Sequence, residues 1–376
     1  MYQIKSFLRA ILRKIYRVLI TIKSLFVILY DKNYTCATSY FPEYADRRKN
    51  RLRIYWDQFI HTIKYSRPNY YYFLYGLDIK GRKNDYVDYT LFMHQRDNNN
   101  NITAPNSSVG VLRNKFYFGL IANSLGIPTP HNIGIIHNGE IYDLSNRITI
   151  SLCEFVEKLT GKLDVFVKSI DGECGDGVYH AIIEDGKIII DKNIYDVVAF
   201  TQLLQDGRFL VQQCITQHDA INKIFNKSIN TIRLETVYDY KTRNIKILPP
   251  LLRVGCGDNN VDNWAMGGLA IGINVEKGVL EEYGFYKPSY GTKVNAHPDS
   301  GVIFKDYEIP YINESIELAM KFHSYFPDIH SIGWDIAITE NGPCIIEGND
   351  NWEISLVQIC SYGLQREFDS LFYNSK

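Results

Sequence analysis

Two acidic residues stand inside apolar runs near the end of the chain, Asp335 in GWDIA and Glu347 in IIEGN. The turn pair Asn341-Gly342 predicts a hairpin of strands 336–339 and 344–347, which places the two carboxylates side by side. Asn349 shares the parity of Glu347 and projects from the same face. Oxygens of this kind suit Mg²⁺. A structural salt bridge is the alternative, but no basic residue lies nearby in the sequence, and this favours a metal site.

A glycine-rich segment follows a short run of β-branched and aromatic residues that ends at Lys168. Gly172, Gly175 and Gly177 permit backbone torsions that turn N–H groups toward an anion, and the lysine adds a point charge for phosphate oxygens. The segment matches neither a Walker A loop nor the Rossmann fingerprint. Read alone, it indicates either a phosphate-binding loop or an ordinary hairpin loop.

Two arginines occur in strand-like runs, Arg233 in NTIR and Arg253 in LRV. A guanidinium in such a run needs an anionic partner, either a phosphate or carboxylate ligand or a salt bridge at the rim of the sheet. Taken together, the lysine–glycine loop, the arginines and the acidic cluster predict a site for a nucleoside triphosphate with magnesium. The chain lacks the HRD and DFG motifs of protein kinases.

Alternating helices and strands must position these residues. The pattern predicts a helix over 112–126, a hairpin over 181–190, a loop and domain boundary at 97–101, and further strands at 165–168, 209–215, 231–238, 246–254 and 269–275. This is a mixed α+β protein with mostly antiparallel pairing. Residues 34–93 interleave basic and aromatic residues. We interpret them as a helical cap rather than as an RNA or glycan contact.

The composition sets the broad class. The chain has 376 residues and a formal net charge of -1, which argues against a nucleic-acid partner. Seven scattered cysteines without a CxxC pair favour reduced thiols in the cytoplasm over a disulfide scaffold. Residues 1–30 form a basic amphipathic pattern too polar to span a bilayer. It predicts either a peripheral anchor at the inner face of the membrane or a helix packed on the protein.

The order of these motifs resembles the ATP-grasp superfamily, and within it the sugar-transfer-associated ATP-grasp proteins of exopolysaccharide biosynthesis. The resemblance extends over residues 112–358. Its most specific segments are SINTIRLETV, DNWAMGGLAIGIN, HPDSG and GWDIAITENGPCIIEGN. It implies an ATP-grasp fold of two α+β subdomains that clasp ATP, preceded by an N-terminal helical region. The implied division is 1–31 amphipathic helix, 32–110 helical and aromatic-rich region, 111–207 lid-bearing subdomain, and 208–376 C-terminal subdomain with the metal site.

The resemblance also assigns roles to single residues. Lys115 and Lys168 correspond to the two ATP lysines, and Gly172, Gly175 and Gly177 belong to the lid loop over the phosphates. Gln212 and Gln213 lie in the hinge that holds adenine, where the family often has Glu at the second position. Arg233 and Arg253 correspond to arginines near the transferred phosphate, and Asp335, Glu347 and Asn349 to the magnesium ligands.

The implied activity is that of a carboxylate–amine ligase, which uses ATP to form an acylphosphate that an amine then attacks. A suitable substrate is the uronic-acid carboxylate of a capsule or O-antigen glycan, joined to an amino acid or another amine. Two alternatives stay open: a phosphotransferase acting on a glycan hydroxyl, and a non-catalytic nucleotide-binding scaffold at the membrane. The stretch 70–75, YYYFLY, suits either sugar stacking or internal packing.

Overall fold

The computed structural model describes residues 2–104, 107–172, 177–190, 193–205, 207–258 and 261–373, with only the backbone considered for 2–10 and 13. The chain divides into two compact units. One unit comprises residues up to 96 together with 285–294 and the segment from 353 onward, and the other comprises 97–284 and 295–352. Every residue predicted to carry the chemistry belongs to the second unit.

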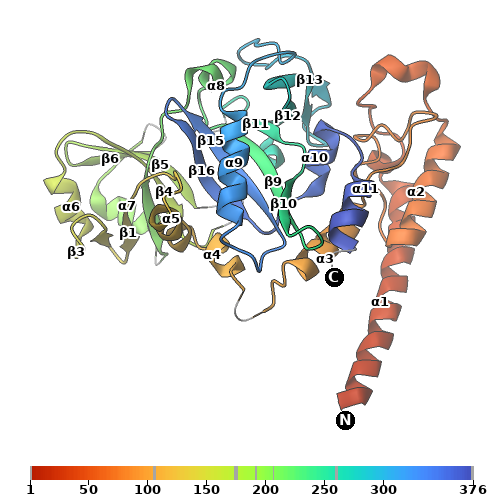
Figure 1. The fold of residues 1–376 in the computed structure, drawn as a ribbon, viewed down its shortest axis with the longest axis horizontal. Helices are drawn as coiled ribbons and strands as arrows, with labels where there is room; N and C mark the ends of the chain where they lie inside the picture. The colour runs from red at the N-terminus through yellow and green to blue at the C-terminus, as the bar shows by residue number, and fades with distance from the viewer. Residues whose placement is uncertain are drawn as a thin grey trace. The chain divides into compact units, whose positions relative to one another are not determined.

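The strands form two antiparallel sheets (Figure 1). The first has the strand order β3-β2-β1-β8-β4-β5-β6-β7. Its strands are β1 (Asn132–His137), β2 (Glu140–Asp143), β3 (Ile148–Ser151), β4 (Leu163–Ser169), β5 (Val178–Glu184), β6 (Lys187–Ile190), β7 (Asn193–Tyr195) and β8 (Phe209–Gln213). Val165, Val167 and Ala181 point into a core covered by α6 (Leu152–Lys158) and α7 (Val197–Leu204). Because side chains alternate along a strand, Lys168 projects from the opposite face of β4.

The second sheet has the order β13-β12-β11-β9-β15-β16, with β10 paired to β9 and the short β14 (Lys293–Val294) beyond β13. Its other strands are β9 (Thr231–Asp239), β10 (Asn244–Ile247), β11 (Leu251–Val254), β12 (Leu269–Asn274), β13 (Val279–Tyr286), β15 (Ser331–Thr339) and β16 (Gly342–Asn349). Helix α9 (Ile312–His323) lies across one face of this sheet (Figure 1). Helices α4 (Val109–Arg113), α5 (Lys115–Ser124) and α8 (Asp219–Ile224) and the short η3 (Trp264–Met266) complete the elements between residues 100 and 352.

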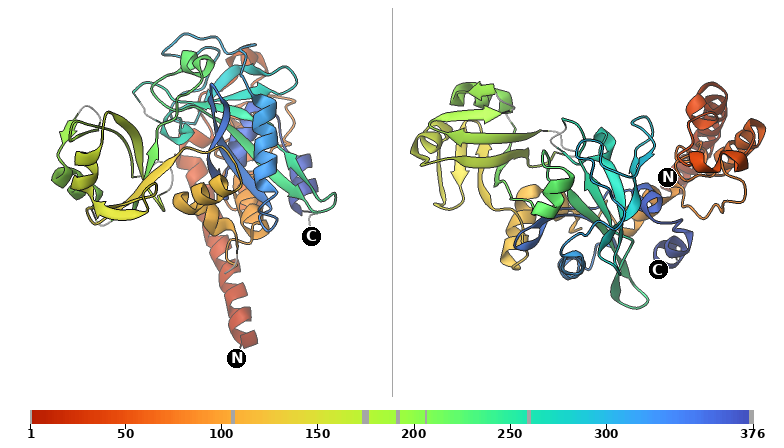
Figure 2. Two further views of the ribbon diagram at one scale, coloured as in Figure 1. Left: turned by 60° about the vertical axis from the view of Figure 1, so that its left-hand side comes forward. Right: turned by 90° about the horizontal axis from the view of Figure 1, so that it is seen from above.

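The N-terminal unit is mainly helical (Figure 2). It contains α1 (Tyr2–Tyr30), η1 (Lys32–Tyr34), η2 (Pro42–Arg47), α2 (Arg51–Tyr65), α10 (Ile354–Cys360), α11 (Gln365–Phe368) and η4 (Asp369–Tyr373); α3 (Tyr89–Asn99) begins in this unit. Gln358 of α10 accepts a hydrogen bond from the Val87 amide (2.8 Å) and donates one to the Tyr75 hydroxyl (3.1 Å). Tyr71, Tyr72 and Tyr75 are buried, so most of the tyrosine-rich stretch serves internal packing.

Three predicted boundaries are wrong, each for a local reason. The helix predicted over 112–126 is interrupted at Asn114, whose side chain accepts hydrogen bonds from the amides of Phe116 and Tyr117 (3.1 and 3.0 Å) and starts a new helix. The strand predicted over 246–254 breaks into β10 and β11 at Pro249-Pro250, because proline has no N–H for the ladder. The loop predicted at 97–101 is helical as far as Asn99.

Candidate active site

The acidic hairpin has the predicted geometry. Asp335 of β15 stands directly opposite Glu347 of β16, and Asn349 lies opposite Gly333. The Asn349 side-chain amide lies 3.3 Å from a carboxylate oxygen of Asp335 and 3.4 Å from one of Glu347. Three oxygen-bearing side chains therefore meet on one face of the second sheet.

Arg233 and Arg253 both bind Asp335. Arg233 stands opposite Asp335 in the β9–β15 register and donates to both carboxylate oxygens, with Nε–Oδ1 at 2.6 Å and Nη2–Oδ2 at 3.0 Å. Nη1 of Arg253 lies 3.1 Å from each oxygen, and its Nη2 lies 2.6 Å from Asp262. The absence of a nearby basic residue in the sequence was thus no argument against a salt bridge, since sheet pairing brings Arg233 to Asp335 across 102 positions.

The surroundings shift the pKa values of Asp335 and Glu347 in opposite directions. Burial disfavours ionisation of Asp335, but the charges of Arg233 and Arg253 outweigh it and hold the pKa of Asp335 well below its usual range. Burial, followed by the negative charge of Asp335, raises the pKa of Glu347. Lys115 and Lys168 oppose that rise, so both lysines lie within electrostatic range of Glu347. The predicted lysines therefore lie near the predicted acidic group.

Lys168 lies at the base of the glycine segment, on the face of β4 that turns away from the core. Its Nζ donates to Oε1 of Gln212 at 3.0 Å, and Nε2 of Gln212 donates to Oδ1 of Asn132 at 2.9 Å. Burial lowers the pKa of Lys168, while Glu347 raises it. Gln213 is exposed on the other side of β8, because consecutive strand residues alternate. The structure thus joins Gln212, and not the side chain of Gln213, to the lysine.

The segment before the lid glycines contacts the first lysine. Lys115 begins α5; its amide donates to the Ile170 carbonyl (3.3 Å), and its Nζ hydrogen-bonds the Gly172 carbonyl. Gly177 has φ +65° and accepts a hydrogen bond from the Ser169 amide at 2.9 Å, which closes the base of the segment. Gly175 lies outside the described residues.

Sequence reasoning missed three buried polar groups of this site. Asp262 accepts from Arg253 and from the Thr231 amide (3.0 Å), and Asn132 supports Gln212. Glu235 is fully buried two positions beyond Arg233, and neither carboxylate oxygen has a hydrogen-bond partner among the described residues. Burial raises the pKa of Glu235 to about 8. Its signal is visible in TIRLET, where charged residues alternate with apolar ones on a strand.

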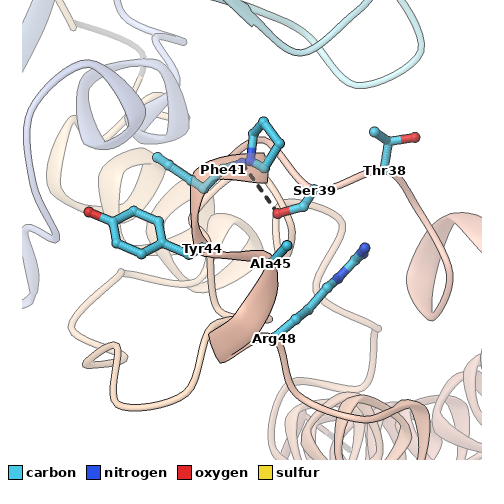
Figure 3. A pocket seen from close by; sticks show the side chains of 7 residues that line it. Thr38, Ser39, Phe41, Tyr44, Ala45 and Arg48 are labelled. Atoms are coloured by element: carbon cyan, nitrogen blue, oxygen red, sulfur yellow. Dashed lines mark hydrogen bonds between the residues drawn. The ribbon is translucent and has the colours of Figure 1, made fainter.

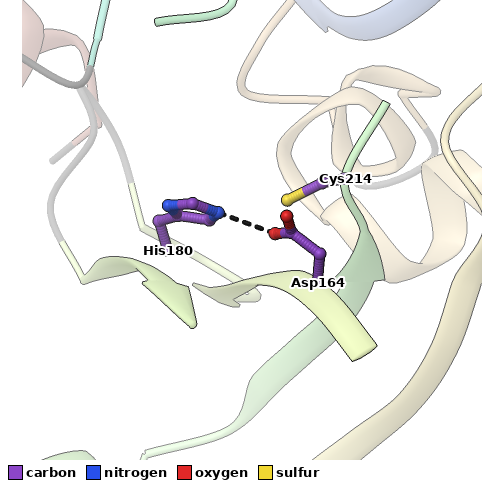
Figure 4. Close-up of side chains that lie close together, drawn as sticks. All are labelled: Asp164, His180 and Cys214. Atoms are coloured by element: carbon purple, nitrogen blue, oxygen red, sulfur yellow. Dashed lines mark hydrogen bonds and ion pairs between the residues drawn. The ribbon is translucent and has the colours of Figure 1, made fainter. Parts of the chain in front are cut away.

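A second polar cluster occupies the first sheet (Figure 4). The atoms of Asp164, His180 and Cys214 that could bind a metal ion all lie within 4.8 Å of one another. Nε2 of His180 is 2.7 Å from Oδ1 of Asp164. Burial, then the hydrogen bond to Asp164, raises the pKa of the Cys214 thiol. Asp164 and Lys168 lie four positions apart on β4, so their side chains project from the same face. The cluster therefore lies on the face of the sheet that carries the lysine.

A small pocket lies in the N-terminal unit, between residues 38 and 48 (Figure 3). It is lined by Thr38, Ser39, Phe41, Pro42, Tyr44, Ala45 and Arg48. Its one charged side chain, Arg48, is already engaged with Asp78 at 3.1 Å and the Ala37 carbonyl at 2.8 Å. None of the predicted site residues lines this pocket.

The chain is an ATP-grasp protein, as a match to a family model over most of its length shows. The family model described as sugar-transfer associated ATP-grasp matches residues 95–370, and the chain belongs to that family. The expected fold, an ATP-grasp domain preceded by N-terminal helices, is confirmed. No curated protein gives a significant match to the chain.

The solved structures that the chain resembles are distant in sequence. The N5-carboxyaminoimidazole synthase of Aspergillus clavatus is 12% identical, with a TM-score of 0.36 over 65% of this chain and 45% of that one. The D-alanine–D-alanine ligase of Helicobacter pylori is 14% identical, with a TM-score of 0.40 over 71% of this chain and 61% of that one. The chain therefore spans less than two thirds of either structure.

The residues present fit a magnesium–nucleotide site in part. Glu347 and Asn349 offer side-chain oxygens, which suit a hard cation; among the described residues, a Glu347 oxygen accepts from the Asn349 side-chain amide at 3.4 Å. Asp335 differs, because each of its oxygens already accepts from both arginines. In this arrangement Asp335 serves first as the anchor of Arg233 and Arg253. Among the described helices, none combines the length and apolarity needed to cross a membrane.

Proposed function

We propose that the protein is an ATP-dependent carboxylate–amine ligase that acts through an acylphosphate. The observation that carries this proposal is that Lys168 hydrogen-bonds Gln212 and Lys115 hydrogen-bonds the Gly172 carbonyl, while both lysines act electrostatically on Glu347, beside two arginines fixed on Asp335. Positive groups poised around one carboxylate cluster favour a bound polyphosphate and offset the charge that develops during phosphoryl transfer.

The residues then divide the work. Lys168 and Lys115 bind the phosphates, Gly172, Gly175 and Gly177 belong to the lid over them, and Gln212 with the backbone at Gln213 holds the adenine. Magnesium, held by Glu347 and Asn349 with Asp335 beside them, would neutralise phosphate charge. Arg233 and Arg253 orient the γ-phosphoryl group and the acceptor carboxylate. The carboxylate oxygen attacks the γ-phosphorus and ADP leaves; the amine nitrogen then attacks the acyl carbon, phosphate leaves, and the amine loses a proton.

The setting we propose is cell-surface polysaccharide biosynthesis, consistent with the sugar-transfer association of the family. The acceptor is a glycan carboxylate such as a uronic acid, and the second substrate is an amino acid or amine. We place the chain in the cytoplasm, with residues 1–30 as a peripheral contact with the inner face of the membrane. Residues 111–207 bear the lid and 208–376 the metal site.

Calorimetry of ATP binding in the presence of magnesium tests the nucleotide site. The wild type is expected to bind, and Lys168→Ala and Glu347→Ala are each expected to lose most of that affinity. Lys162→Ala and Glu184→Ala alter exposed residues just before β4 and at the end of β5. They serve as controls and should bind like the wild type. Wild type that fails to bind, or variants that bind unchanged, would overturn the assignment of the site.

Product analysis separates the ligase from its alternatives. A ligase releases ADP and phosphate and forms an amide, whereas a phosphotransferase releases ADP and leaves a phosphorylated hydroxyl. A non-catalytic scaffold would bind ATP without turnover, and any residual hydrolysis would be unaffected by Asp335→Ala. The acidic cluster and its two arginines favour a catalytic role, because binding alone does not require them.

A further inference from the structure

Helix α2 exposes its apolar side and buries a polar one. Its buried residues are Ile54, Gln58 and Thr62. The large residues of the opposite side are all exposed, from 39% for Phe59 to 81% for Leu52: Leu52, Trp56, Phe59, Ile60 and Ile63. These five recur at helical spacing and form a continuous stripe, which we call the α2 stripe. A helix of a globular protein normally directs such a stripe into the core.

Specific hydrogen bonds fix this orientation. The side-chain amide of Gln58 donates to the carbonyls of Tyr34 and Asn69, at 3.0 Å each, and its oxygen accepts from the Asn69 amide at 2.8 Å. Asn50 caps the helix by accepting from the Arg53 amide at 2.9 Å. Rotating α2 to bury the stripe would break the Gln58 bonds and leave a buried amide unpaired. The outward stripe is therefore a built feature of the unit.

Helix α1 packs beside α2 and also leaves an apolar side uncovered. Arg17 donates to the Ser66 hydroxyl (3.2 Å) and the Lys64 carbonyl (3.1 Å), and Ser24 donates to the Ser66 carbonyl (2.9 Å). The exposed apolar residues of α1, which we call the α1 stripe, lie on the side away from these contacts: Ile15, Val18, Leu19, Ile22, Phe26 and Leu29.

The charged residues of α1 and α2 are predominantly basic. Residues 2–30 contain six basic and no acidic residues, and α2 contains three basic residues and Asp57, whereas the whole chain has a net charge of -1. Asp57 is paired with Lys49 at 2.7 Å. Apolar stripes on strongly basic helices match the acyl boundary and headgroups of an anionic bilayer. A symmetric contact with a second copy would instead oppose like charges.

We propose that the α2 stripe is a membrane-docking surface, on which Trp56 and Phe59 enter the headgroup region of an anionic bilayer alongside α1. The two rings stack with centroids 5.7 Å apart, so they present one aromatic surface. Aromatic side chains of this kind favour the membrane interface. This inference extends the membrane contact proposed for residues 1–30 to a second helix, and it does not depend on the chemistry of the ATP site.

Co-sedimentation of the full chain with vesicles tests the proposal. The wild type is expected to bind vesicles of phosphatidylcholine mixed with phosphatidylglycerol. Binding should weaken at high salt and should be poor on vesicles of phosphatidylcholine alone. The variant Trp56→Ser/Phe59→Ser/Ile63→Ser should lose affinity about tenfold or more. The control Ile194→Ser/Val198→Ser removes two apolar residues that are equally exposed, at 65% and 66%, and should bind like the wild type.

Each outcome is informative because far-UV circular dichroism and urea unfolding report folding independently of the ATP site. If the α2 variant is folded like the wild type and still sediments like it, α2 is not a docking surface. If Leu19→Ser/Ile22→Ser abolishes binding while the α2 variant binds like the wild type, only the contact through residues 1–30 survives. Wild type that ignores anionic vesicles but forms a dimer, lost in the α2 variant, would assign the stripe to a second copy and overturn the proposal.

Discussion

Arg233 and Asp335 form a bidentate ion pair across the strands β9 and β15, with both nitrogen–oxygen distances at 3.0 Å or less. Both side chains are almost fully buried, at 12% and 5% exposure. Arg253 approaches the same carboxylate from β11, so one negative charge holds two guanidinium groups in place. Asp335 therefore has two roles: its buried ion pairs contribute to stability, and they fix the positions from which the two arginines can reach a ligand.

Removing the guanidinium of Arg233 is expected to destabilise the protein. Arg233→Met leaves Asp335 with one buried cationic partner instead of two, and breaking a buried pair costs about 3–5 kcal/mol, with Arg253 reducing that cost. The measurement is the free energy of unfolding in urea. Arg208→Met is the matched control, because Arg208 pairs with Asp171 where both side chains are more than half exposed, and it should cost at most about 1 kcal/mol. Equal losses in the two variants would contradict the buried-pair interpretation.

Glu235 is expected to make stability fall as pH rises. Its pKa is raised to about 8 by burial, so between its ordinary value and about 8 the folded protein holds a proton that the unfolded chain has lost. Within that window stability declines by at most about 1.4 kcal/mol per pH unit. Glu235→Gln keeps the shape but cannot ionise, and it should flatten the decline and be more stable than the wild type at alkaline pH.

Urea unfolding at about pH 5.5 and about pH 8.5 measures this difference. Asp239→Asn is the control. Slight burial opposes ionisation of this carboxyl, but hydrogen bonds from Thr242 and the Lys241 amide outweigh it and lower its pKa, so Asp239 does not titrate in this window. A variant with the same pH slope as the wild type would show that Glu235 is already ionised in the folded protein.

Substitutions of Gln212 and Gln213 are expected to have different effects on the affinity for ATP. Gln212 links Lys168 to Asn132 inside the site, whereas Gln213 is exposed. Gln212→Ala removes both hydrogen bonds and should raise the dissociation constant for ATP about five- to tenfold, as expected for the loss of about 1 kcal/mol. Gln213→Ala keeps the backbone and should change it less than about twofold. Calorimetry decides, and a larger effect at Gln213 would assign the adenine contact to its side chain.

Much of the site could be predicted from local patterns. The hairpin of Asp335 and Glu347 follows from a turn pair between apolar runs, and the same-face position of Asn349 follows from strand parity. What could not be predicted is the partner of Asp335. Arg233 lies 102 positions away, and only the pairing of β9 with β15, set by the packing of the whole sheet, brings it there.

The orientation of α2 is the clearest failure of periodicity. Hydrophobic spacing marks the side of Leu52, Trp56 and Ile63 as the one to bury, yet the structure buries the side of Gln58. The competing signal is the ability of one glutamine to satisfy three backbone groups, which depends on where residues 34 and 69 lie. A sequence pattern therefore identifies an amphipathic helix without stating what covers its apolar side.

Replacing Gly348 by alanine is expected to destabilise the protein because of the indole that faces this position. A Cβ at this position would lie 2.8 Å from Cζ3 of Trp334, its partner in the β15–β16 register. The indole cannot yield easily, since Nε1 donates to Thr236 at 2.7 Å and the ring stacks on Phe322. Gly348→Ala should therefore cost about 1–3 kcal/mol and push β16 outward.

That shift also moves the residues on either side of Gly348, Glu347 and Asn349, so the variant should bind ATP with magnesium more weakly than its loss of stability alone explains. Urea unfolding and calorimetry under conditions where the variant is fully folded separate the two effects. Gly110→Ala is the control, because a Cβ there meets nothing within 4 Å and alanine suits a helix. If Gly348→Ala binds ATP with wild-type affinity, then Glu347 and Asn349 either do not move with β16 or do not hold the nucleotide's metal.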